Sequence, residues 1–500
     1  MSRKMCNLDV PKSIIHKNSE AMSKFTKIPS EIKNFFSEKR GSSVISALLG
    51  LIDSLGIDNR SLGGLKRSNC QLTNLQTFQI LIMIPFFSIK YFSHYAGSAL
   101  SRMFGCGKDV LYSFVSQDNV NWRNIIYRIV TGLIGKIIIR KDYKKSTLPS
   151  VLIVDDTDLP KSGLKMESVG KIFSHVHQKL ILGYKALTMC WSDGRSQFVV
   201  DCSLHGEKGK VEGKEQGLTA GQRSQRYSRE RDSKSHIFKR KDEYFKSKID
   251  KMIEMLRHAV KVGIPFDYLL IDSWFTCKGV VDFVCHCHKR FNLLGMAKMG
   301  KTKYKTAEWG EMTAKAIISK LKAAKQTCYS RRFHCHYAMK DAVLGERKVR
   351  LFFCKRNRKE EWKVLLTTDT KLSFNRAYEI YAMRWSIEVF FSDAKRLLGL
   401  SECSARDFSS QIAHISLVII RYNLLATIKR SLDYETIGGL FNDIYEGVHE
   451  LTVVEKIWDI ILEVVAIVAE MTGADDEELI RQIIENDKRL FALREYANAA

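Results

Sequence analysis

Two short apolar segments that each end in acidic residues place the strongest constraint on the fold of this chain. Val151-Leu-Ile-Val154 has no polar side chain and is followed at once by Asp155 and Asp156. Phe266–Ile271 is a second strand-like segment, followed by Asp272. An apolar run without alternation is typical of a strand that is buried on both faces, as in sheets covered by helices. This part of the sequence therefore predicts an α/β fold.

The acidic residues after the two segments form a candidate site. Sites in open sheets lie at the carboxyl ends of the strands, so neighbouring strands would bring Asp156 (or Asp155) close to Asp272. Two close carboxylates repel each other and are usually bridged by a cation or share a proton. Oxygen ligands alone in a basic protein indicate Mg²⁺ or Mn²⁺. The alternative for each aspartate taken singly is a helix N-cap or a turn residue.

A third acidic residue lies on a strongly patterned segment, Phe374–Leu398, which predicts a helix. Four polar residues at offsets of 3, 7 and 14 fall within roughly 60° of one another on its surface: they are Tyr381, Arg384, Glu388 and Lys395. Glutamate can bind a metal, while arginine and lysine can hold phosphates and tyrosine can hydrogen-bond one. The stripe suits phosphoryl transfer, and the alternative is a helix with a salt-bridged polar face.

The charge of the chain is unevenly distributed. The whole sequence carries a formal net charge of +25. Its last 100 residues hold 9 Lys and Arg against 18 Asp and Glu, which leaves 71 against 37 for the first 400. A body with a net charge of +34 needs a polyanionic partner, and nucleic acid is the usual one. An anionic membrane surface is the weaker alternative, and the acidic last fifth is expected to stay away from DNA.

The spacing Tyr381-x2-Arg384-x3-Glu388-x6-Lys395 resembles the Y–R–E–K signature of bacterial insertion-sequence DDE transposases, the group that includes the Tn-five transposase. The segments VLIVDDTDLPKSG and YLLIDSWF also resemble that family, and the resemblance covers roughly residues 151–400. It implies an RNase H-like core with Asp156, Asp272 and Glu388 as the catalytic, metal-binding triad. The family aspartate directly precedes a threonine, which favours Asp156, and Asp155 stays as the alternative.

The resemblance also implies the chemistry, the cofactor and the partners. Two Mg²⁺ (or Mn²⁺) ions would assist cleavage at transposon ends and strand transfer into target DNA. Tyr381, Arg384 and Lys395 would bind DNA phosphates, and Trp362, just before the strand-like Val364–Thr367, would stack on a flipped base. The protein would act as a homodimer on terminal inverted repeats, in the bacterial cytoplasm at the nucleoid. The alternatives are an RNase H-like nuclease without strand transfer and a non-catalytic, DNA-binding relic of a transposase.

The sequence predicts three regions. Residues 1–145 are helical and are either a DNA-binding region or a cap on the catalytic domain. Residues 146–410 form the catalytic domain, with a β-rich insertion at about 297–371. Residues 411–500 are helical and acidic and are candidates for dimerisation. We expect a long basic loop over His205–His236, which with the basic insertion would hold DNA phosphates, and then a helix over about Phe238–Val262.

Membrane and zinc signals are weak. The most apolar run, Phe78–Ile89, has about 12 residues, whereas a helix that spans a bilayer needs roughly 20. The N-terminus has no apolar core of signal-peptide length. Cys285-His286-Cys287-His288 has a zinc-like composition, but its spacing does not suit common structural zinc sites. The sequence therefore predicts no membrane segment and gives zinc little support.

Overall fold

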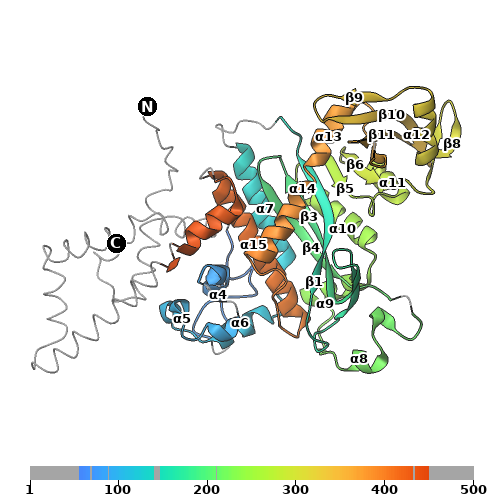
Figure 1. Ribbon diagram of the computed structural model, residues 1–500. Coiled ribbons are helices and arrows are strands. Elements are labelled where there is room, and N and C mark those ends of the chain that lie inside the picture. The colour runs from blue at the N-terminus through green and yellow to red at the C-terminus, as the bar shows by residue number, and fades with distance from the viewer. Residues whose placement is uncertain are drawn as a thin grey trace, which may run out of the picture.

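The computed structural model describes residues 56–449, apart from 68–69, 88, 90, 140–146, 210, 358, 432–433 and 447. Within this range a long mixed sheet is combined with helices that pack on both of its faces (Figure 1). The acidic helical segment after residue 450, expected to support dimerisation, lies outside the described residues. The first 55 residues of the N-terminal region also lie outside them.

The part of the chain before the sheet is helical. Its first long helix begins after Thr73, whose side chain and Gln76 form a reciprocal capping box. The elements of this region are α4 (Asn74–Met83), η1 (Ile84–Phe87), η2 (Phe92–His94), α5 (Ala99–Phe104), α6 (Lys108–Val115) and α7 (Trp122–Ile139). Buried aromatic residues such as Phe78, Phe114 and Trp122 give these helices a core that is continuous with that of the sheet.

The centre of the sheet has five strands in the order β4-β3-β1-β5-β6. They are β1 (Val151–Pro160), β3 (Lys179–Ser192), β4 (Gln197–His205), β5 (Tyr268–Ile271) and β6 (Asn292–Ala297). β1, β3 and β4 pair in antiparallel fashion, whereas β5 lies parallel to β1 and β6 lies parallel to β5. Three antiparallel strands followed by two parallel ones is the strand pattern of an RNase H-like core. The predicted α/β fold class is therefore confirmed.

The sequence analysis missed one strand, β2 (Gly170–Ser174), which pairs with the first half of β3. The first half of β3 thereby becomes one arm of a hairpin that extends beyond the central strands. Gly183 lies where β1, β2 and β3 meet. A Cβ at Gly183 would come within 2.3 Å of the Leu159 carbonyl oxygen, so only glycine fits this crossing without a shift of the backbone.

Residues 297–371 carry most of the remaining strands and continue the same sheet. β12 pairs in antiparallel fashion with β6, and the order then runs through β11, β10, β7 and β8, with β9 on β10. The elements are β7 (Lys303–Thr306), β8 (Gly310–Thr313), α12 (Ala314–Ala323), β9 (Cys328–Ser330), β10 (Cys335–Leu344), β11 (Arg347–Lys355) and β12 (Lys363–Thr367). This β-rich part forms the lobe at the upper right of Figure 1.

Helices connect and cover the central strands. They are η3 (Glu215–Gly217), α8 (Ala220–Ser224), α9 (His236–Asp242), η4 (Glu243–Phe245), α10 (Lys248–Val262), α11 (Lys278–His286), α13 (Phe374–Ala382), α14 (Trp385–Arg396) and α15 (Phe408–Ser431). The helix expected over Phe238–Val262 is divided, because the chain turns at Lys246 and Ser247 caps a new helix. The helix expected over Phe374–Leu398 is divided into α13 and α14 at Met383 and Arg384.

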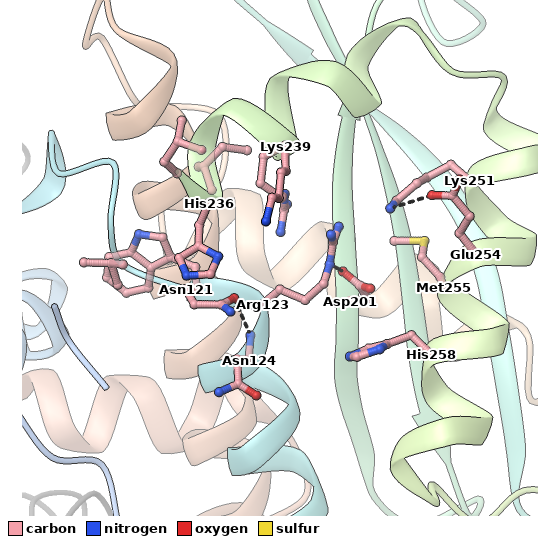
Figure 2. Close-up of a pocket in the computed structure, with 15 residues that line it drawn as sticks. Asn121, Arg123, Asn124, Asp201, His236, Lys239, Lys251, Glu254, Met255 and His258 are labelled. Carbon is pink, nitrogen blue, oxygen red and sulfur yellow. Dashed lines mark hydrogen bonds and ion pairs between the residues drawn. The ribbon is translucent and has the colours of Figure 1, made fainter. Parts of the chain in front are cut away.

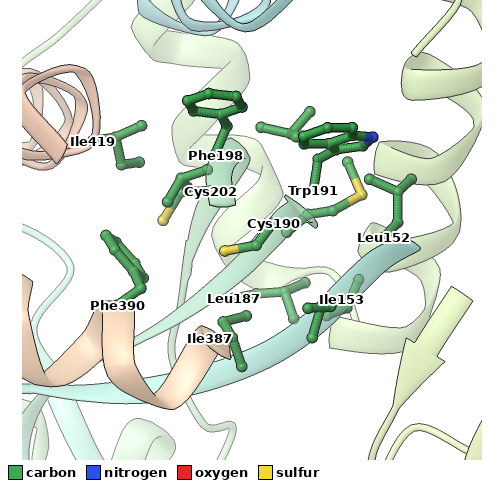
Figure 3. Close-up of a cluster of buried hydrophobic side chains, with 14 of the residues drawn as sticks. Leu152, Ile153, Leu187, Cys190, Trp191, Phe198, Cys202, Ile387, Phe390 and Ile419 are labelled. Carbon is green, nitrogen blue, oxygen red and sulfur yellow. The ribbon is translucent and has the colours of Figure 1, made fainter. Parts of the chain in front are cut away.

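Two helices press an apolar face against the middle of the sheet (Figure 3). Ile387 and Phe390 project from α14 and Ile419 from α15 toward strand residues that include Cys190 and Ile153. All five side chains are buried. Because Ile153 and Asp155 lie two residues apart on β1, their side chains share one face of the strand. This packing brings the polar stripe of α14 to the acidic residues in the middle of β1.

α15 is the central helix of the molecule and is buried along almost its whole length. Asn423 on α15 accepts a hydrogen bond from the Val199 N–H at 2.8 Å and donates one to the Val199 carbonyl at 2.9 Å. Its amide thus satisfies backbone groups of β4, the outer strand. Among the described residues, α15 is also the one helix long and apolar enough to cross a membrane, but 89% of the apolar window is buried inside the protein.

The segment between β4 and α9, expected to be a long basic loop, is held by buried ion pairs. Arg231 donates to Glu167 at 2.8 Å and to Asp118 at 3.1 Å, and Lys241 contacts Glu167 at 2.6 Å. Glu167 also accepts from the Phe408 N–H, at the start of α15. We call Glu167, Arg231, Asp118 and Lys241 the Glu167 cluster. Arginine side chains of this segment therefore bind groups of the protein itself, which leaves fewer of them to bind a ligand.

Candidate active site

Two aspartates come together where the parallel pairing of β1 and β5 stops. Asp272 follows the end of β5, whereas Asp155 lies in the middle of β1, which continues to Pro160 instead of ending before Asp155 as the sequence analysis expected. Val154 is the register partner of Ile271 in the parallel pair, so Asp155 and Asp272 follow at equivalent positions on adjacent strands. Residues at equivalent positions in a parallel pair point to the same face of the sheet. Asp272 is fixed by its own turn, since its Oδ1 accepts from the N–H groups of Trp274 and Phe275 at 2.9 and 3.2 Å.

The polar stripe of the helix faces these aspartates. Arg384 donates to Asp155 Oδ2 at 2.8 Å and also pairs with Glu388 one turn along. The Tyr381 hydroxyl donates to the Ile271 carbonyl at 3.4 Å, immediately before Asp272. The tertiary structure therefore places Tyr381 at the end of β5 and Arg384 at Asp155 in β1, with Glu388 as the second partner of Arg384.

Lys395, the last member of the stripe, also reaches β1. Its Nζ donates to the Thr157 hydroxyl at 2.8 Å. Thr157 lies two residues beyond Asp155 and so on the same face of the strand. Burial lowers the pKa of Lys395, and the neighbouring Asp158 opposes that effect. The four residues of the stripe thus extend along one side of the β1 end.

Asp156, the first acid favoured by the sequence analysis, lies on the opposite face. Its Oδ2 accepts from Lys248 Nζ at 2.9 Å, at the start of α10. Successive side chains of a strand point to opposite faces, so only one of Asp155 and Asp156 can face α14. That residue is Asp155, the alternative that the sequence left open. Asp156 is not brought together with Glu388.

Burial and neighbouring charges shift the pKa values of Asp155 and Arg384. Burial raises the pKa of Asp155 to about 7, and the negative charges of Asp272 and Asp156 act in the same direction. The Asp156 backbone N–H and the Arg384 guanidinium act against this rise. For Arg384, burial lowers the pKa, but Tyr381, Asp155 and Glu388 outweigh that effect and raise it overall. Burial thus favours the neutral form of Asp155, and Arg384 only partly opposes this effect.

The carboxylates suit a divalent metal in their chemistry but are not gathered around one point. Nowhere in the described part of the chain do three or more His, Cys, Asp or Glu side chains come close enough to hold a metal ion, and this includes Cys285–His288. At the present site the reason is Arg384, which stands between Asp155 and Glu388. Asp155 and Asp272 offer oxygen ligands on one face, and a divalent cation would relieve their repulsion.

Trp362 lies on the same edge of the sheet but farther from the acids. β12 is antiparallel to β6, so its first residues lie near the end of β6, at the edge where β5 also ends. In the sheet order, β12 is separated from β5 by β6. The Trp362 ring is half-buried, and Lys355 Nζ lies 5.2 Å from its centroid.

Sequence reasoning missed three residues near the site: Lys248, Thr157 and Trp274. Trp274 directly follows the Asp272 turn and is 42% exposed, which is unusual for so large an apolar side chain. Its position two residues after a strand-ending aspartate was the available signal. Lys248 gave no signal, because its contact with Asp156 joins residues 92 positions apart.

A separate cavity of about 390 Å³ lies between α7, α9, α10 and β4 (Figure 2). It is lined by charged residues that mostly pair with each other. Arg123 donates to Asp201 at 2.8 Å and to Glu243 at 2.9 Å, and Lys251 contacts Glu254 at 3.2 Å. None of the residues predicted for the catalytic site lines this cavity, so we treat its ion pairs as part of the fold.

Two protein-family models match the chain. The family described as DDE superfamily endonuclease matches residues 98–282, which include β1 and the end of β5. The family described as transposase DDE domain matches residues 246–424, which include Asp272 and the whole polar stripe of α13 and α14. These matches support a DDE transposase. Enzymes of the DDE superfamily generally use divalent metal ions.

Comparison with solved structures finds the cryo-EM structure of a piggyBac transposase synaptic complex with hairpin DNA. The two chains are 11% identical, with a TM-score of 0.40, over 80% of this chain and 77% of that one. No curated protein sequence matches this chain.

Proposed function

We propose that this protein is a transposase that cuts DNA at the ends of its element and joins them to target DNA by metal-assisted phosphoryl transfer. One observation carries the proposal: the Tyr381–Arg384–Glu388–Lys395 stripe faces Asp155, in the middle of β1, and the end of β5, which Asp272 follows. The spacing of the stripe supports the narrower assignment to the insertion-sequence group that includes the Tn-five transposase. An RNase H-like nuclease would need no such stripe.

Asp155, Asp272 and Glu388 are the residues that would hold the metal, with Asp155 in place of Asp156. Divalent ions bound there, two in the standard arrangement, would activate the attacking oxygen and stabilise the leaving oxygen of an in-line displacement. Arg384 holds Asp155 and Glu388 in the structure and would have to release Glu388 before that carboxylate could bind a metal. A DNA phosphate is a suitable partner for the released guanidinium, because it offers the same bidentate geometry.

The remaining residues position the DNA. Lys395 would hold a phosphate as a point charge beside Thr157, and Tyr381 would hydrogen-bond a phosphate or pack on a sugar at the Asp272 end. Trp362 is the proposed base-stacking residue on the neighbouring strand. The net charge of +25 supports nucleic acid as the partner. From the resemblance to the transposase family, we further propose that this partner is double-stranded DNA, with terminal repeats bound by a homodimer in the bacterial cytoplasm.

Plasmid cleavage tests the proposal. The purified protein would meet a plasmid that carries the DNA flanking its own gene, with Mg²⁺ or Mn²⁺ present, beside an Asp272→Asn control. We expect metal-dependent breaks at the two repeat ends that the control does not make. Scattered nicks would instead favour a nuclease without strand transfer. Binding at the ends without cleavage would indicate a DNA-binding relic.

A further inference from the structure

The aromatic ring beside the Asp272 turn has an arrangement that the catalytic roles above do not use. Trp274 is 42% exposed, and the next residue, Phe275, is fully buried with its ring centroid 4.8 Å away at an interplanar angle of 76°. Phe275 thus anchors the turn in the core. The indole of Trp274 is left at the rim of the site rather than inside the protein.

A lysine holds this indole from one side. Lys248 Nζ lies 4.1 Å from the centroid of the Trp274 ring, a cation–π contact. The same ammonium donates to Asp156 at 2.9 Å, so its position is set by β1. Asp156 therefore has a structural partner on the face of β1 away from α14. Lys248 thus links Asp156, through an ion pair, to Trp274, through a cation–π contact.

The same tryptophan is tied to the proposed catalytic carboxylate. Its backbone N–H donates to Asp272 Oδ1 at 2.9 Å. The backbone of Trp274 and the Asp272 carboxylate therefore belong to one turn. Because the two residues are only two positions apart, a base stacked on the exposed part of the indole would lie beside the turn that carries Asp272.

We propose that Trp274 is a stacking platform for an unpaired DNA base next to the cleavage point, and that Lys248, held by Asp156, is its positioning residue. This rests on the proposed function, since it takes DNA as the substrate of the Asp155–Asp272–Glu388 site. A flat aromatic face accepts any base, so the platform is independent of sequence. The lysine adds a positive charge beside the nucleotide backbone.

Fluorescence tests the platform without any cleavage. The probe is an oligo-dT of about 20 nucleotides, added in EDTA to the full-length protein, since bases stack on aromatic rings irrespective of sequence. Stacking on Trp274 should quench part of the tryptophan emission. Trp274→Phe should remove that part, whereas Trp385→Phe, a matched control at another exposed tryptophan, should leave it in place. An unchanged quenching amplitude in Trp274→Phe would overturn the proposal.

Affinity gives the second measurement, with a fluorescein-labelled form of the same oligonucleotide. Trp274→Ala should weaken binding about 5-fold to 100-fold, the usual loss for one stacked base, while Trp274→Phe should keep most of the affinity. Lys248→Met should give an intermediate loss with an unchanged melting temperature. Wild-type affinity in Trp274→Ala would contradict the inference. Neither measurement involves cleavage, so the two proposals can fail separately. A protein that binds the oligonucleotide through Trp274 but does not cut DNA would refute the proposed reaction and leave the stacking platform intact.

Discussion

At the scale of single residues, the choice between two adjacent aspartates decides the chemistry of the site. Asp155 pairs with Arg384 at 2.8 Å and lies beside Asp272, whereas Asp156 pairs with Lys248 at 2.9 Å on the other face of β1. The sequence favoured Asp156 because a threonine follows it. The structure brings Asp155 toward α14, and this difference can be measured directly.

Asp155→Asn should abolish metal-dependent cleavage, and Asp156→Asn should not. Loss of a proposed metal ligand should lower the cleavage rate by more than about 100-fold, beyond the 10- to 100-fold that an outer partner of a ligand costs. Asp156→Asn keeps a side chain of the same size and should stay within about tenfold of wild type. The measurement is the rate of plasmid breakage under identical metal conditions. The opposite ranking of the two variants would return the first position of the triad to Asp156.

The pH dependence of stability is a second test at this scale. Burial raises the pKa of Asp155 from its ordinary value of 3.8 to about 7. Between these values the folded protein binds more protons than the unfolded chain, so Asp155 lowers the free energy of unfolding as the pH rises. Asp155→Asn removes the ionisable group and, with it, this pH-dependent decrease in the free energy of unfolding. In metal-free buffer the variant should gain stability relative to wild type from about pH 4 to about pH 8.

That gain has an upper limit of about 4 kcal/mol, at about 1.4 kcal/mol for each pKa unit. Solvent contact with the carboxylate makes the true value smaller, since its side chain is 17% exposed. Thermal denaturation across the pH range supplies the measurement. A difference between the two proteins that does not change with pH would show that Asp155 ionises in the folded protein much as it does in the unfolded chain.

At the scale of elements, the Glu167 cluster joins parts of the chain that are far apart in sequence. Glu167 lies between β1 and β2, Asp118 precedes α7, Arg231 lies in the segment before α9, and Glu167 accepts from the first residue of α15. The side chains of Glu167 and Arg231 are 2% and 1% exposed. Several charge-assisted hydrogen bonds thus meet in a buried place where an unpaired charge is costly.

Glu167→Gln should destabilise the protein by about 3–5 kcal/mol, because it leaves Arg231 buried without its main partner. The matched control is Glu215→Gln, in the segment between β4 and α9 that also carries Arg231. Glu215 is 79% exposed and contacts Arg223 only at 3.8 Å, so its loss should cost less than about 1 kcal/mol. Urea unfolding of both variants gives the comparison. Equal effects of the two substitutions would mean that the buried pair adds no more stability than a surface pair.

At the scale of the whole molecule, the surplus of positive charge sets the expected binding to DNA. The segment before α9 uses its arginines internally, which leaves the β-rich lobe as the more exposed basic surface. Lys315 and Lys322 lie seven residues apart on α12, so they share one face, and both are exposed. They are candidates for contacts with DNA phosphates.

The logarithm of the DNA affinity should fall linearly with the logarithm of the salt concentration. Contacts to 6–10 phosphates would lower the affinity by about 10³- to 10⁵-fold between 50 and 200 mM salt. Replacing both Lys315 and Lys322 with Gln should reduce the slope by about 2. Lys246→Gln is the control, because that ammonium already pairs with Glu254 at 2.7 Å. The measurement is fluorescence anisotropy on labelled duplex DNA. An unaltered slope in the double variant would place the DNA elsewhere on the surface.

The amino-acid sequence by itself determined the features that depend on local pattern. An apolar run predicts a buried strand, and the two apolar runs form the buried residues of β1 and β5 in the structure. Offsets of 3, 7 and 14 place Tyr381, Arg384, Glu388 and Lys395 on one helical face, and all four reach the ends of the strands or each other. These signals are local because helix and strand periodicity are properties of the backbone.

Only the tertiary structure decided which faces meet. Adjacent strand residues always point to opposite sides, so the sequence cannot state whether Asp155 or Asp156 faces α14 until the helix is packed on the sheet. The same holds for Arg384, which stands between Asp155 and Glu388, and for Lys248, which joins Asp156 to Trp274. Each of these contacts joins residues far apart in the chain, and their formation depends on long-range packing that no local pattern encodes.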